Sequence, residues 1–496
     1  MASFPKKTIE LNADGFRDRV YACWLGKNIG GTLGGPYEGK QCTLNVQGFS
    51  SEPGKPRPND DLDLQLIWLH VMEKAGPLAI RSEILGEYWI SLIPPNWNEY
   101  GIGKNNMRRG LVPPFSGEYQ NNWKNSNGAW IRTEIWACMA PGCPVLAAKY
   151  AMEDGKVDHG MGEGTLAAAF VAAMQSAAFV LRDLRACIEI GLSLIPATSR
   201  MADSVRFILS CFDGGMTAME ARNAILARNA DIGDGWFEAP SNVSYVLIGL
   251  LWGDGDFKKS MLTTVNCGDD TDCTGATVGA TLGILGGMDV IPEDWRQHIG
   301  DDIVTISINR SDNRSGAAVP ATCTELTRRV TAQTPYVLFA NRQAVCLTSG
   351  PDNIPADIKE YLALIMEKQR KELSLSFACT AHFESAALCA DLSVCDGADI
   401  APLQEKRITA TVYSQPTLGD EPVNLTCRWW LPDGFRITEG KQTAFVCRQC
   451  SCYSGKAELS FTVAAGESVP PTNRLVLEIV PEGRYSPLYI PIVLLG

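Results

Sequence analysis

Two clusters of acidic and amide residues, in distant parts of the chain, have the types and spacing needed for metal chemistry. They lie in RPNDDLDLQLIWLH and NCGDDTDCTGATVGATLGILGG, and they supply Asn59, Asp60, Asp61 and Asp63, and Asp269, Asp270 and Asp272. Acids at a helix start can cap its free N–H groups. Capping explains one or two acids per cluster, but not consecutive acids in both. Because carboxylate and amide oxygens are the ligands that Mg²⁺, Mn²⁺ and Ca²⁺ prefer, we expect the clusters to meet at a hard-cation site with enough carboxylates for two ions.

Two helical stripes of glycine accompany these clusters. Glycines recur every four residues, at Gly26, Gly30 and Gly34, and at Gly275, Gly279, Gly283 and Gly287. Each glycine inside a helix costs about 1 kcal/mol relative to alanine, so a stripe of them needs a reason. A stripe without side chains allows two helix backbones to approach closely. Packing without any site would explain the glycines alone; beside an acidic cluster, close approach would bring short Asp side chains from different helices to one metal pair.

Composition limits the classes of function that this chain can have. It has 496 residues, 45% of them hydrophobic, a net charge of −12 and a pI of about 5.0. That length favours more than one domain, and the acidic balance argues against binding a nucleic-acid backbone. The start, MASFPKKTIELNADGF, lacks the apolar segment of a secretory signal, and no stretch offers the roughly 20 apolar residues of a membrane span. We therefore expect a cytoplasmic protein with no membrane partner.

The 17 cysteines suit reduced intracellular thiols better than a disulfide framework. One group of four lies close enough in the sequence to suggest a zinc site: Cys427, Cys447, Cys450 and Cys452. Zinc prefers four such ligands, but the group lacks a second CxxC pair. Unligated thiols on strands are the favoured interpretation, with zinc as the alternative.

The pattern of the chain changes once along its length. Helical spacing of apolar residues, as in DGFRDRVYACWLGKNIGGTLGG, predicts an all-α domain over residues 1–345. The stretch IPADIKEYLALIMEKQRKEL predicts an amphipathic helix, which we assign to a linker over residues 346–374. Stretches such as KRITATVYS and KAELSFTVAAG alternate between turn residues, which predicts a β-sandwich accessory domain over residues 375–496.

Three motifs resemble those of a known family. The stretches LGKNIGGTLGGPYEG, NDDLDL and GDDTDCTGATVGATLG resemble, in order and separation, the motifs of the ADP-ribosylglycohydrolase family, which includes the hydrolase that removes ADP-ribose from dinitrogenase reductase. The resemblance covers roughly residues 15–310 and is greatest to large bacterial members. The C-terminal β-region lies outside it.

The resemblance implies an all-α catalytic domain that binds two Mg²⁺ ions, or Mn²⁺, and it implies roles for individual residues. The implied metal ligands are Asn59, Asp60, Asp61, Asp270, Asp272 and Cys273. The implied catalytic residues are Glu38, Asp61 and Asp270, and Glu38 is also expected to bind substrate. In VDHGMGEG, the residues Asp158, His159 and Gly162 are further substrate-binding candidates, with a structural role for the histidine as the alternative. The chain departs from the family pattern at four positions. Asn59 stands where Thr is usual, and Cys273 stands where Thr or Ser is usual. Leu62 replaces a second Thr, and Gly31 stands where an acid often occurs.

The expected reaction is hydrolysis of an ADP-ribosyl or related ribosyl bond in a small molecule or a protein. Two ions can hold the 2- and 3-hydroxyls of the sugar and lower the pKa of a bound water, while Glu38 or Asp270 takes the proton of that water. One alternative is a glycosidase for a small nucleoside or sugar furanoside, with the β-domain binding carbohydrate. The second alternative, suggested by the four departures, is a catalytically inactive module that binds ADP-ribose. Glu134 is either part of a buried ion pair near Arg132 or a pocket residue.

Overall fold

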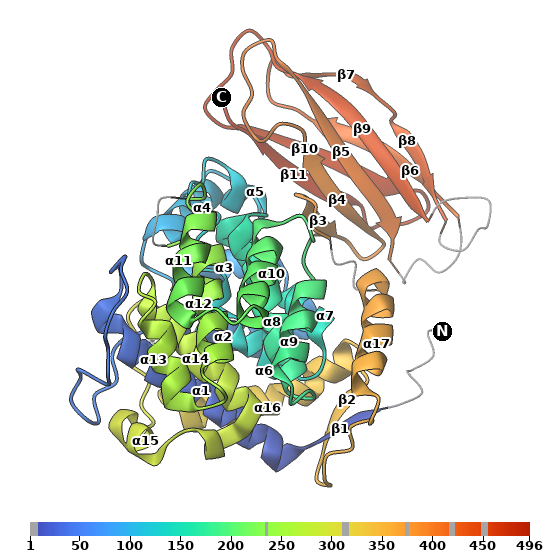
Figure 1. Ribbon diagram of the computed structural model, residues 1–496. Helices are drawn as coiled ribbons and strands as arrows, with labels where there is room; N and C mark the ends of the chain where they lie inside the picture. The colour runs from blue at the N-terminus through green and yellow to red at the C-terminus, as the bar shows by residue number, and fades with distance from the viewer. Residues whose placement is uncertain (1–7, 234–236, 310–316, 373–375, 416–421, 448–454) are drawn as a thin grey trace. The chain divides into compact units, whose positions relative to one another are not determined.

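The computed structural model describes residues 8–233, 237–309, 317–372, 376–415, 422–447 and 455–496 (Figure 1). The chain forms two compact units. The first contains residues 1–104 and 121–377, and the second contains residues 105–120 and 378–496. The first unit is almost entirely helical and the second is built from β-strands, as the sequence predicts.

Helices contain most of the described residues of the first unit. They are α1 (Ala13–Gly34), α2 (Asp60–Ala75), α3 (Ser82–Leu92), α4 (Asn98–Arg108, whose last residues belong to the second unit), α6 (Glu134–Met139), α7 (Pro144–His159), α8 (Glu163–Ala178), α9 (Leu184–Ser193), α10 (Arg200–Asp213), α11 (Ala218–Arg228), α12 (Ala239–Trp252), α13 (Phe257–Val265), α14 (Thr271–Gly286), α15 (Glu293–Ile299), α16 (Cys323–Ala340) and α17 (Ile358–Glu372). A short parallel pair of strands, β1 (Ile9–Asn12) and β2 (Val345–Thr348), joins two distant segments. The sequence did not predict this pair, because each strand has only 4 residues, too few to show an alternating pattern.

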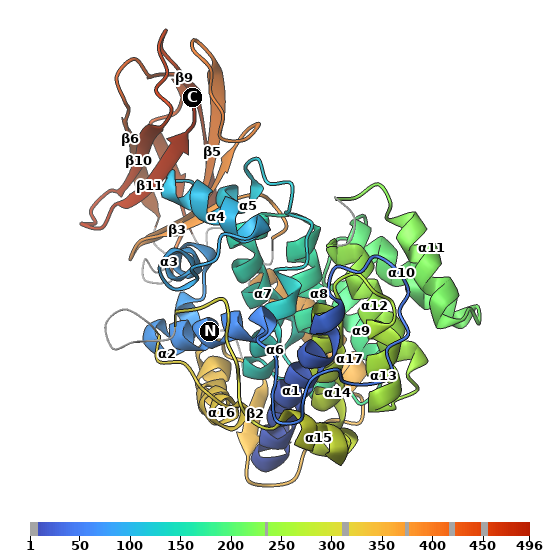
Figure 2. The ribbon, with the colours of Figure 1, turned by 90° about the vertical axis from the view of Figure 1, so that its left-hand side faces the viewer.

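Helices α1 and α14 form the central pair of the unit and lie side by side in two perpendicular views (Figures 1 and 2). Their glycines face each other's backbone. A Cβ atom on Gly26 would lie 2.3 Å from the carbonyl oxygen of Gly279, and one on Gly30 would lie 2.2 Å from that of Gly275. A Cβ atom on Gly34 would lie 2.1 Å from the Thr271 carbonyl oxygen. The predicted close approach of two helix backbones is therefore confirmed, and it brings the end of α1 beside the start of α14.

Among the described residues, no single helix has the length and apolar character needed to cross a membrane. One pair bent by 115°, Thr271–Val290 with Glu293–Ile299, meets those two criteria. Residues Thr271 to Ile284 of that pair are buried within the helical unit.

The second unit is a β-sandwich. One sheet has the order β3-β4-β5-β9-β7 and the other β11-β10-β6-β8. The strands are β3 (Ala381–Glu384), β4 (Leu388–Val394), β5 (Glu405–Ser414), β6 (Val423–Trp430), β7 (Arg436–Gly440), β8 (Thr443–Val446), β9 (Lys456–Ala464), β10 (Asn473–Pro481) and β11 (Leu488–Leu494). Alternate residues of both sheets form one apolar core, which is what the alternating pattern predicts.

The second unit also includes a segment from far earlier in the chain. Residues 105–120, with the short helix α5 (Phe115–Glu118), belong to it. Leu111 packs with Val493 and Leu495, and the Tyr119 hydroxyl donates to Asp399 Oδ1 at 2.6 Å. No local pattern predicted this insertion, because the segment has too few apolar residues to show a helical or strand period.

Of the four cysteines considered for zinc, Cys427 and Cys447 are buried. Cys450 and Cys452 lie outside the described residues. The zinc alternative therefore stays a prediction.

The packing of α1 against α14 predicts that these glycines cannot accept even a methyl group. Gly30→Ala would place its Cβ within 2.2 Å of the α14 backbone, so we expect the free energy of unfolding to fall by about 1–3 kcal/mol, although alanine favours a helix. Gly15→Ala, in the first turn of the same helix, meets only the Asn12 side chain at 3.4 Å and should be neutral or stabilising by up to about 1 kcal/mol. Urea midpoints compare the two variants; equal stability of Gly30→Ala and the wild type would disprove the close-packing argument.

Candidate active site

The two acidic clusters meet at one cavity in the helical unit. Asn59 caps the start of α2, and Asp270 precedes the start of α14. A cavity of about 430 Å³ opens beside these two helix starts, and it is lined by Gly35, Glu38, Arg57, Pro58, Asp60, Trp97, Asn98, Glu99, Tyr100, Gly128, Ile131, Phe237, Asp270, Asp272, Cys273 and Ile306. The predicted convergence of the clusters is therefore observed, and it brings Glu38 to the same place.

The acidic residues form two groups with the spacing of metal ligands. In the first group, one ligand atom each from Asp61, Asp272 and Cys273 lies within 4.8 Å of the other two. In the second group, ligand atoms of Glu38, Asp270 and Asp272 meet the same criterion. Asp272 belongs to both groups, so the two potential ion positions are adjacent.

Buried oxygens in these groups have no hydrogen-bond donor among the described residues. They are Asp61 Oδ2, Asp270 Oδ1 and Asp272 Oδ1. Asp61 and Asp270 are fully buried, and Asp272 is 8% exposed. A buried anionic oxygen without a partner is strongly unfavourable. The donor set therefore fits divalent cations, which would supply the missing partner.

The crowding of carboxylates shifts their pKa values upward. Repulsion from Asp272, together with burial and the charge of Asp60, raises the pKa of Glu38 to about 8. Burial, followed by repulsion from Asp272, raises the pKa of Asp60 to about 7. Burial is also the largest cause of the raised pKa values of Asp61 and Asp270. Without a cation, these carboxyl groups therefore keep their protons to a higher pH than free carboxyl groups do.

Glu38 reaches the cluster because two loops are joined by backbone hydrogen bonds. The Gly39 N–H donates to the Asp269 carbonyl at 2.9 Å, and the Asp269 N–H donates to the Lys40 carbonyl at 2.9 Å. Asp269 has a φ of 62°, an uncommon conformation for a residue with a side chain. The hydroxyl of Tyr245 donates to its carboxylate at 3.0 Å, and Arg222 lies 3.5 Å away. Asp269, included in the second cluster at the outset, therefore holds the loop while Asp270 and Asp272 face the cavity.

Asp63 is likewise turned away from the cavity. Its Oδ2 accepts hydrogen bonds from the backbone N–H groups of Ile306 and Ser307, both at 2.6 Å. Asp63 thus anchors the loop that supplies Ile306 to the cavity wall.

Two of the departures from the family pattern, Asn59 and Gly31, lie next to each other in the structure. Asn59 Oδ1 accepts a hydrogen bond from the Asp61 N–H at 2.9 Å, so this oxygen caps α2. A Cβ atom on Gly31 would lie 1.7 Å from Asn59 Nδ2. The amide therefore occupies the space that a side chain at position 31 would fill, and the two departures are physically linked.

Cys273 lies among the carboxylates, as the resemblance of its motif implies. Its thiol donates to Asp61 Oδ1 at 3.3 Å. Burial, with repulsion from the surrounding acids, raises the pKa of this thiol well above its usual value. In the absence of a cation, the thiol is therefore protonated.

A buried lysine lies beneath the first ligand group, and sequence reasoning missed it. Lys27 Nζ is 3.1 Å from Glu134 Oε2 and 3.9 Å from Asp61 Oδ2, and it donates to the Ile131 carbonyl at 2.7 Å. Gln65 also donates to Glu134 at 2.9 Å. Glu134 is thus a buried ion-pair residue, but its partner is Lys27 and not Arg132.

Three predicted substrate-binding residues lie outside the lining of the cavity. Asp158 Oδ1 is 2.8 Å from Arg132 Nη2 and 2.9 Å from His159 Nδ1, so both side chains belong to a buried ionic network. Gly162 packs against a backbone carbonyl, since its Cβ would lie 2.2 Å from the Lys124 oxygen. Their contribution to the cavity is indirect, through the elements that they hold.

Glu99 connects that network to the cavity, and no sequence motif indicated it. It lines the cavity, is 2% exposed, and has Oε1 at 4.0 Å from His159 Nε2. Burial is the largest cause of its raised pKa of about 7.

Three more polar side chains that touch the acids were also missed as site residues. The Tyr100 hydroxyl donates to Asp60 Oδ2 at 3.3 Å, and Asn127 Nδ2 donates to Asp270 Oδ2 at 2.6 Å. Asn242 Oδ1 accepts from the Asp270 N–H at 3.2 Å. Their contacts are long-range, so local spacing held no signal for them.

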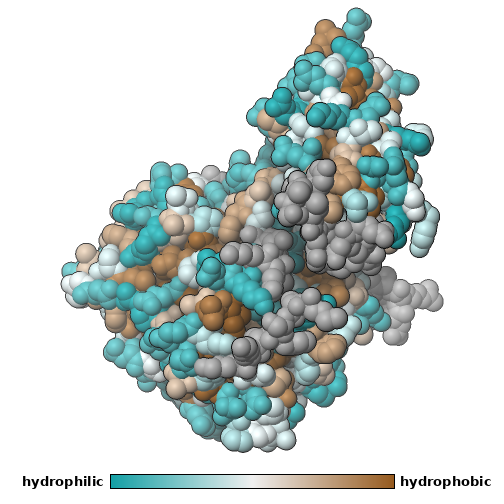
Figure 3. All heavy atoms as spheres, turned by 90° about the vertical axis from the view of Figure 1, so that its right-hand side faces the viewer, coloured by the Kyte–Doolittle hydropathy of each residue, from teal (hydrophilic) through white to brown (hydrophobic). Residues whose placement is uncertain are grey.

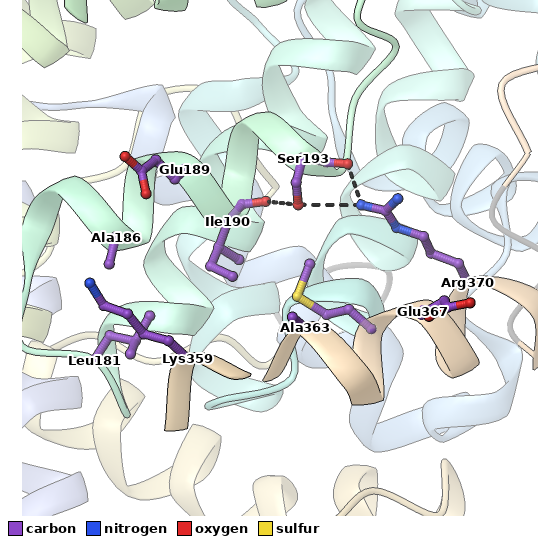
Figure 4. Close-up of a pocket in the computed structure, with 10 residues that line it drawn as sticks. Leu181, Ala186, Glu189, Ile190, Ser193, Lys359, Ala363, Glu367 and Arg370 are labelled. Atoms are coloured by element: carbon purple, nitrogen blue, oxygen red, sulfur yellow. Dashed lines mark hydrogen bonds between the residues drawn. The ribbon is translucent and has the colours of Figure 1, made fainter. Parts of the chain in front are cut away.

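A second cavity, of about 340 Å³, lies between α9 and α17 (Figure 4). Apolar side chains such as Leu181, Ile190 and Met366 line it, and Arg370 donates to Ser193 Oγ at 3.3 Å. Hydrophilic and hydrophobic residues are mixed over the face that carries α17 (Figure 3). None of the predicted site residues lies in this second cavity.

Comparisons with known proteins agree with the motifs. No curated protein sequence matches this chain. A solved structure described as an ADP-ribosylglycohydrolase-related protein complex is 18% identical, with a TM-score of 0.42, over 65% of this chain and 99% of that one. A FixG-related protein from Vibrio parahaemolyticus is 13% identical, with a TM-score of 0.17, over 22% of this chain and 95% of that one. Structural similarities this low carry no argument. The model of the ADP-ribosylglycohydrolase family, however, matches residues 12–323, which is more than half of the chain, and this protein therefore belongs to the ADP-ribosylglycohydrolase family.

Proposed function

We propose that this protein is a metal-dependent glycohydrolase that cleaves an ADP-ribosyl or related ribosyl bond. The observation that carries this proposal is the convergence of acidic side chains: Glu38, Asp60, Asp270 and Asp272 line one cavity, and Asp61 lies beside Asp272 and Cys273 of its lining. Three of their buried oxygens have no donor among the described residues. Such an arrangement is unfavourable for a folded protein unless cations occupy it.

Two divalent ions, Mg²⁺ or Mn²⁺, are the proposed cofactors. Asp61 and Asp272 would hold one ion, with Cys273 in its group, and Glu38, Asp270 and Asp272 would hold the other. Bound ions supply Lewis acidity for orienting the sugar diol and for activating water. The fit rests on the unpartnered buried oxygens described above.

The protein side chains have separate proposed tasks in this reaction. Glu38 is exposed at the cavity, and without a cation its pKa is raised to about 8. A bound cation would lower that pKa and leave the carboxylate ionised, so that it can accept a proton from water near neutral pH. Asn127 donates to the Asp270 carboxylate and Asn242 accepts from the Asp270 backbone N–H, so this residue is held in place before substrate arrives. It is the alternative proton acceptor.

The rest of the cavity lining favours a nucleoside diphosphate over a small sugar. Arg57 provides a guanidinium that can bind phosphate oxygens. Trp97 and Phe237 provide aromatic surface for a base. A volume of about 430 Å³ is within the range of ligand sites.

The direct test is a substrate panel analysed by mass spectrometry, with Mg²⁺ or with EDTA. The panel contains ADP-ribosyl-arginine, an ADP-ribosyl-serine peptide, nucleosides and simple furanosides. We expect metal-dependent release of ADP-ribose. Release of sugar from small glycosides alone would instead establish the furanoside glycosidase, and binding of ADP-ribose without any turnover would establish the inactive binding module.

Asp272 belongs to both ligand groups, so its loss should disable both ion positions. Asp272→Asn should reduce turnover by more than about 10³-fold and remove Mn²⁺ binding measured by calorimetry, as expected when metal and catalysis depend on one residue. The metal-free variant should be at least as stable as the wild type, because it loses repulsion with Glu38 and Asp60. Asp256→Asn, which alters an acid that only caps α13, is the matched control. Wild-type turnover in Asp272→Asn would rule out the dimetal model.

The raised pKa values predict a metal-dependent pH profile of stability. Glu38 and Asp60 titrate near 8 and 7 in the folded protein, but near 4 when unfolded. At pH values between the unfolded and the folded pKa, the folded state binds more protons than the unfolded state. The free energy of unfolding therefore falls as pH rises from 5 to 8. Saturating Mg²⁺ should remove much of this decline, because the bound ions hold the carboxylates deprotonated. Melting temperatures measured from pH 5 to pH 9, with EDTA or Mg²⁺, test this; parallel profiles would contradict it.

A further inference from the structure

The two ligand groups differ in chemistry. We infer that the Asp61–Asp272–Cys273 group selects a thiophilic divalent ion, with Zn²⁺ as the reference, whereas the Glu38–Asp270–Asp272 group takes Mg²⁺ or Mn²⁺. The inference rests on the proposed dimetal function and names a different ion for one of its two positions. The cysteine at position 273, where the family usually has Thr or Ser, would thus change which ion binds at this position.

The geometry places the sulfur among ligand atoms. Cys273 Sγ is 3.3 Å from Asp61 Oδ1, and single ligand atoms of Asp61, Asp272 and Cys273 lie within 4.8 Å of one another. All three residues are more than nine-tenths buried. Asp61 Oδ2 and Asp272 Oδ1 have no hydrogen-bond donor among the described residues. A cation in this group would therefore contact a sulfur and two carboxylates.

Ligand softness decides which ion binds. Thiolate sulfur binds Zn²⁺ and other thiophilic ions strongly, and Mg²⁺ requires oxygen ligands in near-octahedral geometry. The second group, Glu38, Asp270 and Asp272, contains only carboxylates. One protein would thus hold a hard ion and a softer ion at adjacent positions.

The neighbouring Lys27 does not oppose this assignment. Its ammonium is 3.9 Å from Asp61 Oδ2, but it lies closer, at 3.1 Å, to Glu134 Oε2. It also donates to the Ile131 carbonyl. Lys27 is therefore shared between Glu134 and Asp61, with Glu134 as the nearer carboxylate, and none of its described contacts is with Asp272.

Binding at this group changes the protonation of Cys273. The S–H bond breaks, the sulfur keeps the electron pair and forms a bond to the ion, and the proton leaves to solvent. No oxidant or reductant takes part.

The test uses Co²⁺ as a spectroscopic probe on the full-length protein stripped of metal with EDTA. Wild-type protein should develop a near-ultraviolet sulfur-to-cobalt charge-transfer band. Cys273→Ser and Cys273→Thr should lose that band, and their Zn²⁺ affinity should fall by more than about 10-fold, since even the loss of an outer-shell partner costs roughly that much. Cys323→Ser removes a buried cysteine from the start of α16 and should keep both properties. Circular dichroism checks that each variant is folded.

The outcomes separate this inference from the proposed function. A charge-transfer band that depends on Cys273 supports the inference. Two bound Co²⁺ or Mn²⁺ ions with no charge-transfer band would overturn it and leave the dimetal glycohydrolase standing. No metal binding of any kind would overturn both. A band that persists in Cys273→Ser would also overturn the inference, because another of the cysteines would then be the ligand.

Discussion

The site depends on the direct contact between the backbones of α1 and α14. Gly26, Gly30 and Gly34 face the α14 backbone at distances that leave no room for a Cβ atom. This contact brings the end of α1, and Glu38 just beyond it, beside the start of α14, where Asp270 and Asp272 lie. Ligand atoms of Glu38, which follows α1, and of Asp272, in the first turn of α14, lie within 4.8 Å of each other as a result. The glycines' unfavourable helix propensity is therefore the cost of assembling the site.

Buried charge is the second constraint, and the fold balances most of it with specific partners. Glu134 is paired with Lys27 and bound by Gln65, and Arg132 lies between Asp154 and Asp158. Around the cavity the balance is left incomplete. Asp61, Asp270 and Asp272 each retain an oxygen with no donor among the described residues. The contrast indicates where cations belong: Glu134 and Asp158 have positively charged partners, whereas Asp270 Oδ1 and Asp272 Oδ1 have no donor among the described residues.

Much of the architecture was predictable from local pattern. Helical spacing predicted the first unit, alternation predicted the sandwich, and three motifs predicted the family. The convergence of the acidic clusters was also predictable. Two acidic clusters at helix N-termini, together with two glycine stripes, are explained at once if closely packed helices bring the acids to one metal site. Glu99, Tyr100 and Lys27 were missed, since each acts through contacts with residues far away in the sequence. Asp158 and His159 were expected at the substrate; they are not among the residues that line the cavity, and they form an ionic network with Arg132.

The sequence by itself determined which residues have metal-binding chemistry, because carboxylates, their spacing and the adjacent glycines are local properties of the chain. Only the tertiary structure decided how those residues divide their tasks. It placed Asp63 and Asp269 on backbone and loop contacts, used Asn59 as a helix cap in the space left by Gly31, and put the Cys273 thiol against Asp61. Those outcomes depend on which helix faces which, and on the partner that each buried polar atom finds. Such pairings are set by the packing of the whole helical unit and not by any one stretch of sequence.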